Sequence, residues 1–483
     1  MCGVAGAVLA KNRHNLGKYL YAMLYNLQHR GKESAGMFVD KGEGFSQKTE
    51  GLGTIDRVFM GVDLDNFGGF AGVAHNRYST SGLNPRSFAG SEECLRACQP
   101  MTGIFQGKTF ALSYNGNLVN TEELQKIISE KITGGRHIMP IRPDVDTALI
   151  VALIEMSKAY DFKDALEETL PLLSGAFSIA VLYDGNLYVV RDRLGFRPVF
   201  ICQFRDGVAV ASETCAFSSL PEAGESQMLA RGQMAVISSD SPYRYDVELW
   251  SKNMHNGCFC MFEYIYFARP DGFLGKERVM FIQERLGQKL AQVAPSNADI
   301  VIGVPDSGIN AARGYAEESG LIFKPEAIFR PHTVGRTFID PVQDLRREGV
   351  RFKHFVIDEI VGGKKVVVVD DSIIRGTTVP RIVNLLREAG AKEIHVRISS
   401  PPYRHPCYFG IDTWRIKGEL IAENFAGDAD KICQEIGADS LAYGMEAKDC
   451  AMPAFPESTP SLLENRSASS ADFYYFILRF VLE

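Results

Sequence analysis

The residues with the clearest chemical potential lie in the stretch VVVVDDSIIRGTT, residues 366–378. Asp370 and Asp371 end a run of valines, and a short loop follows that contains Arg375, Gly376, Thr377 and Thr378. Ligands of open parallel sheets bind beyond the carboxyl ends of the strands. A helix N-terminus after such a loop attracts phosphate through its free amides and its dipole. Two carboxylates beside a phosphate loop suit a sugar phosphate, with its hydroxyls or a cation facing the acids.

Asp370 and Asp371 also admit a plainer interpretation, because Asp-Asp-Ser is an ordinary solvated turn after a strand. Adjacent residues of a regular strand point to opposite faces, so only one of the two would then aim at a ligand. A second loop, VIGVPDSG at 301–308, has the same form of strand, tight turn and helix. PDSG alone is a common turn, but two such loops in one domain favour a phosphate site.

The amino terminus offers a different chemistry. Cys2 follows the initiator Met, and the small side chain at position 2 should permit removal of that Met. Cys2 would then carry a thiol and a free α-amine, whose usual pKa of about 7.7–8.0 lets it accept the thiol proton near neutrality. A nucleophile that carries its own base is the design of the N-terminal-nucleophile enzymes. The alternative is an incidental cysteine near a frayed terminus.

The elements that must position these groups show two different sequence patterns, one in each half of the chain. The first half alternates short β-like runs with turns, among them FALSYNGNL (110–118) and AFSIAVLYDGNLYVVRD (176–192). Asn115-Gly116 and Asp184-Gly185 are both turn signals, and the second indicates a hairpin. Helical patterns cover 18–28 and 144–160, with Asp144 or Asp146 as a cap of the second. These features predict two packed antiparallel sheets flanked by helices.

The second half has the pattern of an α/β domain. Nearly continuous Val and Ile at 298–304, 364–370 and 392–398 predict buried parallel strands. Helical patterns at 310–320 and 379–390 alternate with them, and Gly390 is suited to a helix C-terminus. We expect domains at 2–240 and 258–445, joined through turn-rich residues, and a loosely ordered tail at 446–483.

Composition limits the class of protein. A chain of 483 residues predicts two or more domains, and 46% hydrophobic with 23% charged residues indicates a globular protein. The net charge of −7 argues against a general nucleic-acid or membrane surface. The start is not a signal peptide, and the apolar run 473–482 is about half the length that a bilayer requires. Ten scattered cysteines form no compact disulfide pattern, so we expect a cytoplasmic protein.

The element at 366–378 closely resembles the phosphoribosyl pyrophosphate (PRPP) signature of the type I phosphoribosyltransferases, and VIGVPDSG resembles their pyrophosphate loop. The resemblance implies an α/β domain with a mainly parallel sheet, ribose hydroxyls held by the acids, and the 5′-phosphate held by the loop. It also implies Mg²⁺, with Ser307, Asp370 and Asp371 as ligands. The implied PRPP-binding residues are Asp306, Ser307, Gly308, Arg330, Arg336, Lys353, Asp370, Asp371, Ser372, Arg375, Gly376, Thr377 and Thr378.

The first half resembles the glutaminase domain of the class II glutamine amidotransferases, an α+β N-terminal-nucleophile sandwich of αββα type. The matching blocks occur in the family order: CGVAG (2–6), LQHRGKESAG (27–36), HNRYSTSG (75–82), YNGNL (114–118), VDTAL (145–149), SGAFS (174–178), RDRLGFRP (191–198) and ASE (211–213). The resemblance implies that Cys2 attacks the side-chain amide of glutamine. It assigns the oxyanion hole to Asn115 and the Gly116 amide, the glutamine α-carboxylate to Arg77, and the α-ammonium to Asp146.

A glutaminase joined to a PRPP site resembles one family, the glutamine PRPP amidotransferases, over roughly residues 2–445. The resemblance implies that ammonia from glutamine displaces pyrophosphate at C1 of the ribose, in the first step of purine synthesis. It further implies inhibition by purine nucleotides and assembly as a homodimer or homotetramer. No nucleic-acid or membrane partner is expected.

Several stretches depart from the family pattern. RPHTVGRTFI (330–339) stands where the family has KNRYVGRTFI, so that His332 and Thr333 replace an Arg and a Tyr that helps to seal the ammonia passage. KHF (353–355) is also altered, and residues 83–98 are an insertion. Cys260 and Cys407 match two of four cysteines that hold an iron–sulfur cluster in one branch. The C-terminal CxxC is absent, so no cluster is expected.

Two alternatives to the amidotransferase remain open at this point. One is a divergent paralogue with a working glutaminase and an altered or lost amination of PRPP. The other is a non-catalytic protein that senses PRPP or nucleotides. Intact Cys2, Arg77, Asn115 and Asp146 argue against the sensor, which has no use for a glutaminase site.

Overall fold

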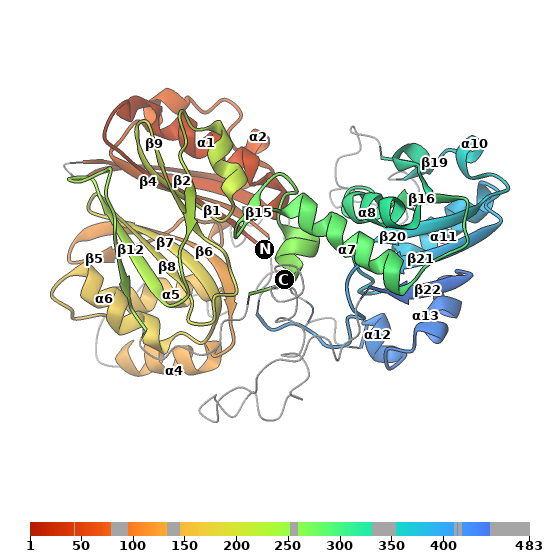
Figure 1. The fold of residues 1–483 in the computed structure, drawn as a ribbon. Helices are drawn as coiled ribbons and strands as arrows, with labels where there is room; N and C mark the ends of the chain where they lie inside the picture. Colours follow the sequence, from red (N-terminus) through yellow and green to blue (C-terminus); the bar gives the residue numbers. More distant parts are fainter. Residues whose placement is uncertain are drawn as a thin grey trace. The chain divides into compact units, whose positions relative to one another are not determined.

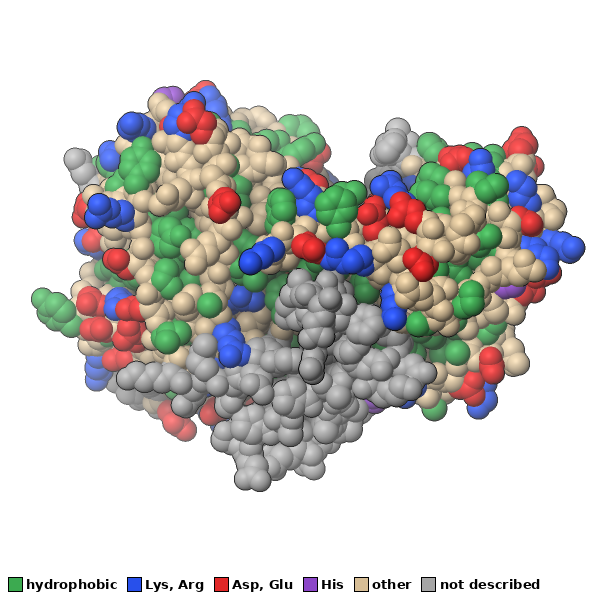
Figure 2. Space-filling model, in the orientation of Figure 1, with side chains coloured by type: hydrophobic (Ala, Val, Ile, Leu, Met, Phe, Trp, Pro, Cys, Tyr) green, Lys and Arg blue, Asp and Glu red, His purple; other side chains and the backbone are tan. Residues whose placement is uncertain are grey.

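The structure is a computed structural model, and it describes residues 1–42, 44–78, 95–132, 145–251, 259–330, 354–409, 413 and 418–444. The chain divides into two compact units. The first holds Met1–Cys260 with the short pieces Asp271–Gly275 and Cys407–Asp412, and the second holds most of the remaining chain. Among the described residues, no helix is both long and apolar enough to cross a bilayer. Side chains of both charge signs are interspersed over the face drawn in Figure 2.

Two antiparallel sheets form the centre of the first unit (Figure 1). Within the described residues, the first sheet has the order β11 (Ser226–Met228), β9 (Phe200–Phe204), β10 (Gly207–Ala211), β1 (Gly3–Leu9), β4 (Ala71–Arg77), β2 (Ser34–Gly42) and β3 (Phe45–Leu52). The second sheet has the order β13 (Asp246–Leu249), β12 (Gln233–Ser238), β8 (Asn186–Arg191), β7 (Gly175–Tyr183), β6 (Lys108–Leu118) and β5 (Met101–Phe105). The second sheet thus continues past residue 240, since β13 pairs with β12.

Apolar side chains join the two sheets and attach helices to their outer faces. Val4 and Val73 of the first sheet share one core with Ala111 and Val189 of the second. Helix α1 (Leu16–Asn26) packs on β1 and β4, and α5 (Asp146–Glu155) packs on β5 and β6. Among the residues of this unit that the structure describes, the other α-helices are α2 (Ile55–Val58), α4 (Thr121–Ile132) and α6 (Phe162–Thr169). This αββα arrangement confirms the predicted sandwich.

One of the two turn signals was wrong. Asp184 and Gly185 have φ of 47° and 74° and connect β7 to β8, as the hairpin prediction required. Asn115 and Gly116 lie inside β6, opposite Ser178 and Phe177 of β7. The glycine at 116 serves close strand approach, because a Cβ there would lie 2.1 Å from the carbonyl oxygen of Ala176.

The second unit contains a parallel sheet with helices on both faces (Figure 1). The strand order is β17 (Ile322–Phe323), β16 (Ile300–Gly303), β20 (Lys365–Asp370), β21 (Glu393–Ile398) and β22 (Ser440–Tyr443), and every pair is parallel. Two short strands, β18 (Ile328–Phe329) and β19 (Phe355–Val356), pair separately. The α-helices in the described part of this unit are α7 (Val279–Val293), α8 (Ile309–Ser319), α10 (Asp358–Val361), α11 (Val379–Glu388), α12 (Ile421–Asn424) and α13 (Ala429–Ile436).

The valine run of β20 is buried on both sides of this sheet. Val367 and Val369 belong to the core with Ala312 and Tyr315 of α8. Val366 and Val368 belong to the opposite core, which includes residues of α11 and α13. Strands covered on both faces have continuous rather than alternating apolar sequences, so VVVV is the expected pattern. The predicted α/β fold with a mainly parallel sheet is confirmed.

Candidate functional site

The predicted nucleophile lies at the start of β1. The Cys2 side chain is 8% exposed, and its main-chain N–H donates to Asn115 Oδ1 at 3.0 Å. Met1 precedes Cys2 in the structure, so this nitrogen is a peptide amide that stands in for the α-amine left after Met removal. Cys2 Sγ lies 3.5 Å from the nitrogen and from the oxygen of Tyr78. The two predicted neighbours, Cys2 and Asn115, are therefore in contact across 113 residues of sequence.

A hollow of about 300 Å³, counted with its open solvent, lies beside this thiol. It brings together four of the predicted glutaminase residues, namely Cys2, Arg77, Gly116 and Asp146. The fifth, Asn115, is 1% exposed and borders Cys2 through the hydrogen bond above. The other lining residues are Tyr78, Gln99, Tyr114, Val145 and Thr147.

The Asp146 side chain lines this hollow. The prediction that Asp146 could cap a helix was wrong. The N-cap of α5 is Val145, which makes no capping bond, and the other cap candidate, Asp144, lies outside the described residues. Asp146 Oδ2 accepts the Leu118 N–H at 2.9 Å and the Tyr114 hydroxyl at 3.3 Å. Burial and then the Asp146 charge raise the pKa of Tyr114 well above its usual 10.0, so the phenol stays a neutral donor.

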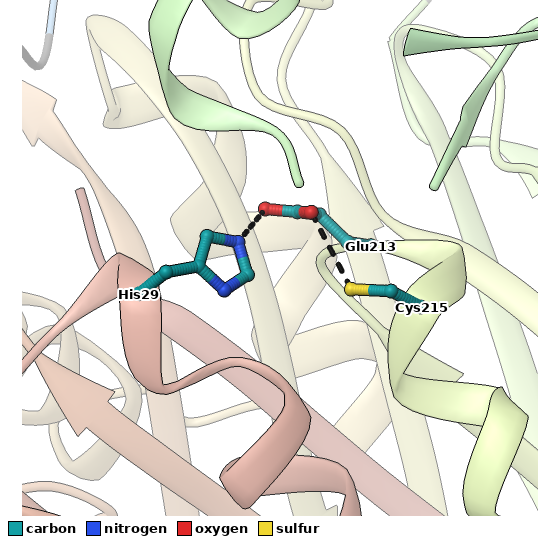
Figure 3. Close-up of side chains that lie close together, drawn as sticks. All are labelled: His29, Glu213 and Cys215. Carbon is teal, nitrogen blue, oxygen red and sulfur yellow. Dashed lines mark hydrogen bonds and ion pairs between the residues drawn. The ribbon is translucent and has the colours of Figure 1, made fainter. Parts of the chain in front are cut away.

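A buried ion pair holds the nucleophile from the other side, and the sequence had assigned its residues no role. Arg30 Nε donates to the Cys2 carbonyl oxygen at 3.1 Å, and Arg30 Nη1 bonds Glu213 Oε1. His29 Nε2 lies 2.8 Å from the same oxygen, and Cys215 Sγ lies 3.5 Å from Glu213 Oε2 (Figure 3). The motif blocks contained Arg30 and Glu213, but a pair 183 residues apart carries no spacing signal.

His29, Glu213 and Cys215 are also the group of described residues whose potential metal-ligand atoms lie within 4.8 Å of one another. The Glu213 carboxylate already forms an ion pair with the Arg30 guanidinium, and the two side chains are 2% and 0% exposed, respectively. A metal cation on Glu213 would face that buried positive charge directly. The cluster therefore fits a counter-ion network better than a metal centre.

The second set of predicted residues meets at neighbouring strand ends in the other unit. β16 and β20 are parallel and in register, with Gly303 opposite Val369. The loops that follow bring Ser307 Oγ to 3.4 Å from Asp370 Oδ1. Gly308 permits this approach, because a Cβ there would lie 2.3 Å from the Val369 carbonyl oxygen.

Asp370 and Asp371 lie together rather than on opposite faces. β20 ends at Asp370, so the alternation expected of a regular strand does not extend to Asp371. Asp370 Oδ1 accepts the Asp371 N–H at 2.9 Å, and Ser372 Oγ donates to Asp371 Oδ2 at 2.5 Å. Burial first, and then the Asp371 charge, raise the pKa of Asp370 well above its usual 3.8. Two buried carboxylates and a serine hydroxyl form an oxygen-rich site of the kind that suits Mg²⁺ and ribose hydroxyls.

The remaining predicted PRPP residues that the structure describes differ in their contacts and exposure. Gly376 has a φ of 65°, which turns the loop toward α11, and Thr378 is the N-cap of that helix. Thr377 and Arg375 are exposed, and Arg375 lies 3.6 Å from Glu419. Arg330 Nη1 bonds Asp306 Oδ2 at 2.6 Å. Arg336 and Lys353 lie outside the described residues.

Comparisons with known proteins match both halves. A glutamine amidotransferase domain covers residues 92–219, and a phosphoribosyl transferase domain covers 275–418. Amidophosphoribosyltransferase from Bacillus subtilis is 39% identical over 443 residues, which are 92% of this chain and 87% of the relative. The enzyme of the same name from Methanocaldococcus jannaschii is 36% identical over 92% of each chain. A solved B. subtilis glutamine PRPP amidotransferase, complexed with ADP and GMP, superimposes with a TM-score of 0.79 over 92% of this chain and 91% of the other, at 36% identity.

The chain belongs to the amidophosphoribosyltransferase family. Membership accounts for the presence of an N-terminal-nucleophile sandwich and a phosphoribosyltransferase fold in one polypeptide. It also explains why the two halves of the chain match two separate domain families.

The two cysteines that by sequence resemble cluster ligands of one family branch are both buried. Cys260 and Cys407 are 1% and 4% exposed, and Cys407 Sγ accepts the Phe409 N–H at 3.3 Å. Cys450 lies outside the described residues. The burial of both thiols fits small apolar side chains in a core.

Proposed function

We propose that the protein hydrolyses glutamine and transfers the released ammonia to PRPP. The Cys2 thiol attacks the side-chain carbonyl carbon of glutamine, the C–N bond breaks and ammonia leaves. Water then cleaves the thioester to glutamate. Ammonia forms a bond to C1 of PRPP, the C1–O bond breaks, and the products are 5-phosphoribosylamine and pyrophosphate.

The glutaminase roles rest on the hollow beside Cys2. The α-amine of processed Cys2 accepts the thiol proton, and the Asn115 amide and the Gly116 N–H stabilise the oxyanion. The Arg77 guanidinium pairs with the substrate α-carboxylate, and Asp146 accepts from its α-ammonium. The observation that carries this assignment is that Cys2, Arg77, Gly116 and Asp146 line one hollow.

The PRPP roles rest on the loops after β16 and β20. Asp370 and Asp371 accept the ribose hydroxyls, and residues 372–378 bind the 5′-phosphate at the start of α11. Residues 306–308 bind the pyrophosphate group, with Arg330, Arg336 and Lys353 as its cations. Ser307, Asp370 and Asp371 would hold Mg²⁺, which offsets the charge of the leaving diphosphate when it is bound.

The test is to supply PRPP with glutamine or with free ammonia and to measure phosphoribosylamine and pyrophosphate. We expect product from both nitrogen donors. Cys2→Ala should abolish the glutamine-dependent reaction and leave the ammonia-dependent rate within about twofold, because ammonia does not require the thiol. No pyrophosphate from either donor would contradict the proposed function, and loss of both activities in Cys2→Ala would assign Cys2 a structural role.

The sequence departures favour one second candidate, an enzyme whose glutaminase and transferase reactions are poorly coupled. His332 and Thr333 replace residues of the loop that in the family closes over PRPP. Product from ammonia but not from glutamine, with glutamate still formed, would identify this candidate.

Several finer assignments accompany the proposal. The glutaminase domain is taken as 2–240, the phosphoribosyltransferase domain as 258–445, and 446–483 as a tail. We expect a cytoplasmic homodimer or homotetramer inhibited by purine nucleotides, and the ADP and GMP bound to the B. subtilis relative support the choice of inhibitor. We also expect no iron–sulfur cluster, because the C-terminal CxxC that would supply two of the four ligands is absent from the sequence; stoichiometric iron after anaerobic purification would contradict this.

A further inference from the structure

A short segment from the far end of the chain is part of the glutaminase unit. After β21 and residues 399–406, the chain returns to the first unit at Cys407. Cys407 and Phe409 are only 4% and 8% exposed there. The segment is therefore an integral part of this core, although it follows most of the phosphoribosyltransferase sequence.

Two side chains of the glutaminase sequence bind the main chain of this segment. Asn117 Nδ2 donates to the Tyr408 carbonyl oxygen at 2.8 Å, and Arg197 Nη2 donates to the Phe409 carbonyl oxygen at 2.8 Å. The Phe409 ring also stacks on Phe196, with centroids 4.8 Å apart and planes 13° apart. A buried ring and two main-chain acceptors thus fix the segment on adjacent parts of the sandwich.

Both donors are connected to the catalytic hollow. Asn117 follows Asn115 by two residues on β6, so the two side chains share a face of that strand. The next residue, Leu118, gives its N–H to Asp146. A shift of β6 at Asn117 would therefore move both the oxyanion donors and the residue proposed to hold the α-ammonium.

Arg197 places a buried positive charge near the amino terminus. Its side chain is among the largest that are fully buried, with 1% exposure. Burial is the main cause that lowers the pKa of the Met1 amine to about 5, and the charges of Arg197 and Arg30 lower it further. Met1 stands one residue ahead of the amine that processing would create. Arg197 thus lies within electrostatic range of the amino terminus.

We propose that residues 407–409 are a positioning element of the glutaminase site, which hold Asn117 and Arg197 and through them the oxyanion strand. The inference rests on the proposed glutaminase activity and goes beyond it, since it makes hydrolysis depend on residues outside the glutaminase sequence. Phe409 touches no substrate; it acts by anchoring the two carbonyl oxygens.

The decisive variant is Phe409→Leu in the full-length protein. We expect the glutaminase kcat to fall about tenfold, because small misplacements of reacting groups cost up to about a hundredfold in rate. The KM for glutamine should rise less than kcat falls, because Asp146 would shift with β6 whereas Arg77, proposed to bind the α-carboxylate, lies on β4. The ammonia-dependent transferase rate should not change. Asn117→Ala removes one donor without altering the aromatic core and should lower kcat in the same direction.

Phe162→Leu is the matched control. Phe162 is 2% exposed in the same unit and stacks on Tyr183, with centroids 4.2 Å and planes 12° apart. It is absent from the lining of the hollow. Both Leu variants should lower Tm by similar amounts, but only Phe409→Leu should lower kcat. Equal losses of kcat in the two variants, or wild-type kcat in Phe409→Leu and Asn117→Ala, would overturn the proposal.

A second readout separates this inference from the proposed function. The rate at which a diazoketone analogue of glutamine alkylates Cys2, followed by mass spectrometry, reports the placement of the thiol without turnover. We expect about tenfold slower labelling in Phe409→Leu. If the wild type forms no glutamate but this difference persists, the proposed function fails and the inference stands. If the wild type hydrolyses glutamine and labelling is unchanged in Phe409→Leu, the inference alone fails.

Discussion

At the scale of single residues, the nucleophile proposed for glutamine hydrolysis contacts a buried charge pair that the motif blocks did not reveal. Arg30 and Glu213 are 0% and 2% exposed, and Arg30 is bonded to the carbonyl oxygen of Cys2. Removal of one partner of a buried ion pair leaves an uncompensated charge, which costs about 3–5 kcal/mol. The position of Cys2 is thus tied, through Arg30, to the Glu213 carboxylate, which is not among the residues that line the hollow.

Glu213→Gln should test this dependence. The change keeps the shape of the side chain but leaves Arg30 without its counter-ion, so we expect a lower Tm and a lower glutaminase kcat. The measurements are thermal unfolding and glutamate release. His29→Gln is the control, because His29 bonds the same carboxylate from a partly exposed position and should cost less in both. Wild-type kcat in a folded Glu213→Gln variant would contradict the role of the pair.

Asp370→Asn should abolish PRPP binding and raise the stability of the unliganded protein. The raised pKa of Asp370 means that the folded chain binds its proton more tightly than the unfolded chain. The stability that this group contributes is therefore present at low pH and is lost as pH rises through the folded-state pKa. Above that pKa, Asn removes a buried charge, and we expect a higher Tm of the unliganded protein together with loss of PRPP binding.

The measurement for Asp370→Asn is Tm from pH 4 to 8, without ligand and with Mg²⁺ and PRPP. The advantage of the variant over the wild type should grow as pH rises, and PRPP should raise Tm of the wild type alone. Asp428→Asn, in the same unit, is the control: hydrogen bonds from Lys431 lower the pKa of that carboxyl, so its titration lies below this pH range and the Tm difference from the wild type should stay nearly constant. A variant less stable than the wild type at pH 8 would refute the argument.

At the scale of elements, the strands and helices were predictable wherever burial dictated a pattern. The valine run predicted β20 to within one residue, and the pattern at 310–320 predicted α8. Both predictions succeeded because the burial of a strand or helix determines the spacing of its apolar residues. The prediction of a turn at Asn115-Gly116 was wrong. The sequence does not distinguish a glycine that permits close approach of two strands from a glycine that a turn requires. The Arg30–Glu213 and Phe409–Arg197 contacts could not be predicted, since long-range pairing leaves no local pattern.

Gly116→Ala should show that β6 and β7 require this close approach. The added Cβ would lie 2.1 Å from the Ala176 carbonyl oxygen, so the strands must separate. Overpacking of this kind costs typically about 1–3 kcal/mol, and we expect a lower Tm and strongly reduced glutamate release. Gly224→Ala is the control, because its nearest atom, the Gln203 carbonyl oxygen, would be 3.3 Å from the Cβ. Equal Tm values for the two variants would refute the argument.

At the scale of the whole molecule, the useful quantity is the phosphoribosylamine formed per glutamine hydrolysed. The described residues contain the hollow proposed for glutamine hydrolysis and the acidic pair proposed for PRPP binding, so each half-reaction would have its own site. The sequence departures fall instead in the loop that closes over PRPP in the family, at His332 and Thr333. Loss of coupling would therefore lower this ratio without lowering either half-reaction.

Thr333→Tyr should raise that ratio, because it restores the aromatic residue that helps to seal the ammonia passage in the family. The measurement is phosphoribosylamine against glutamate at saturating PRPP, with the ammonia-dependent rate followed in parallel. His332→Arg is the matched neighbour: it adds a cation to the loop without a ring, so it should affect the KM for PRPP more than the ratio. A ratio near one in the wild type would show that this chain couples its reactions without the tyrosine, and an unchanged low ratio in Thr333→Tyr would place the leak outside this loop.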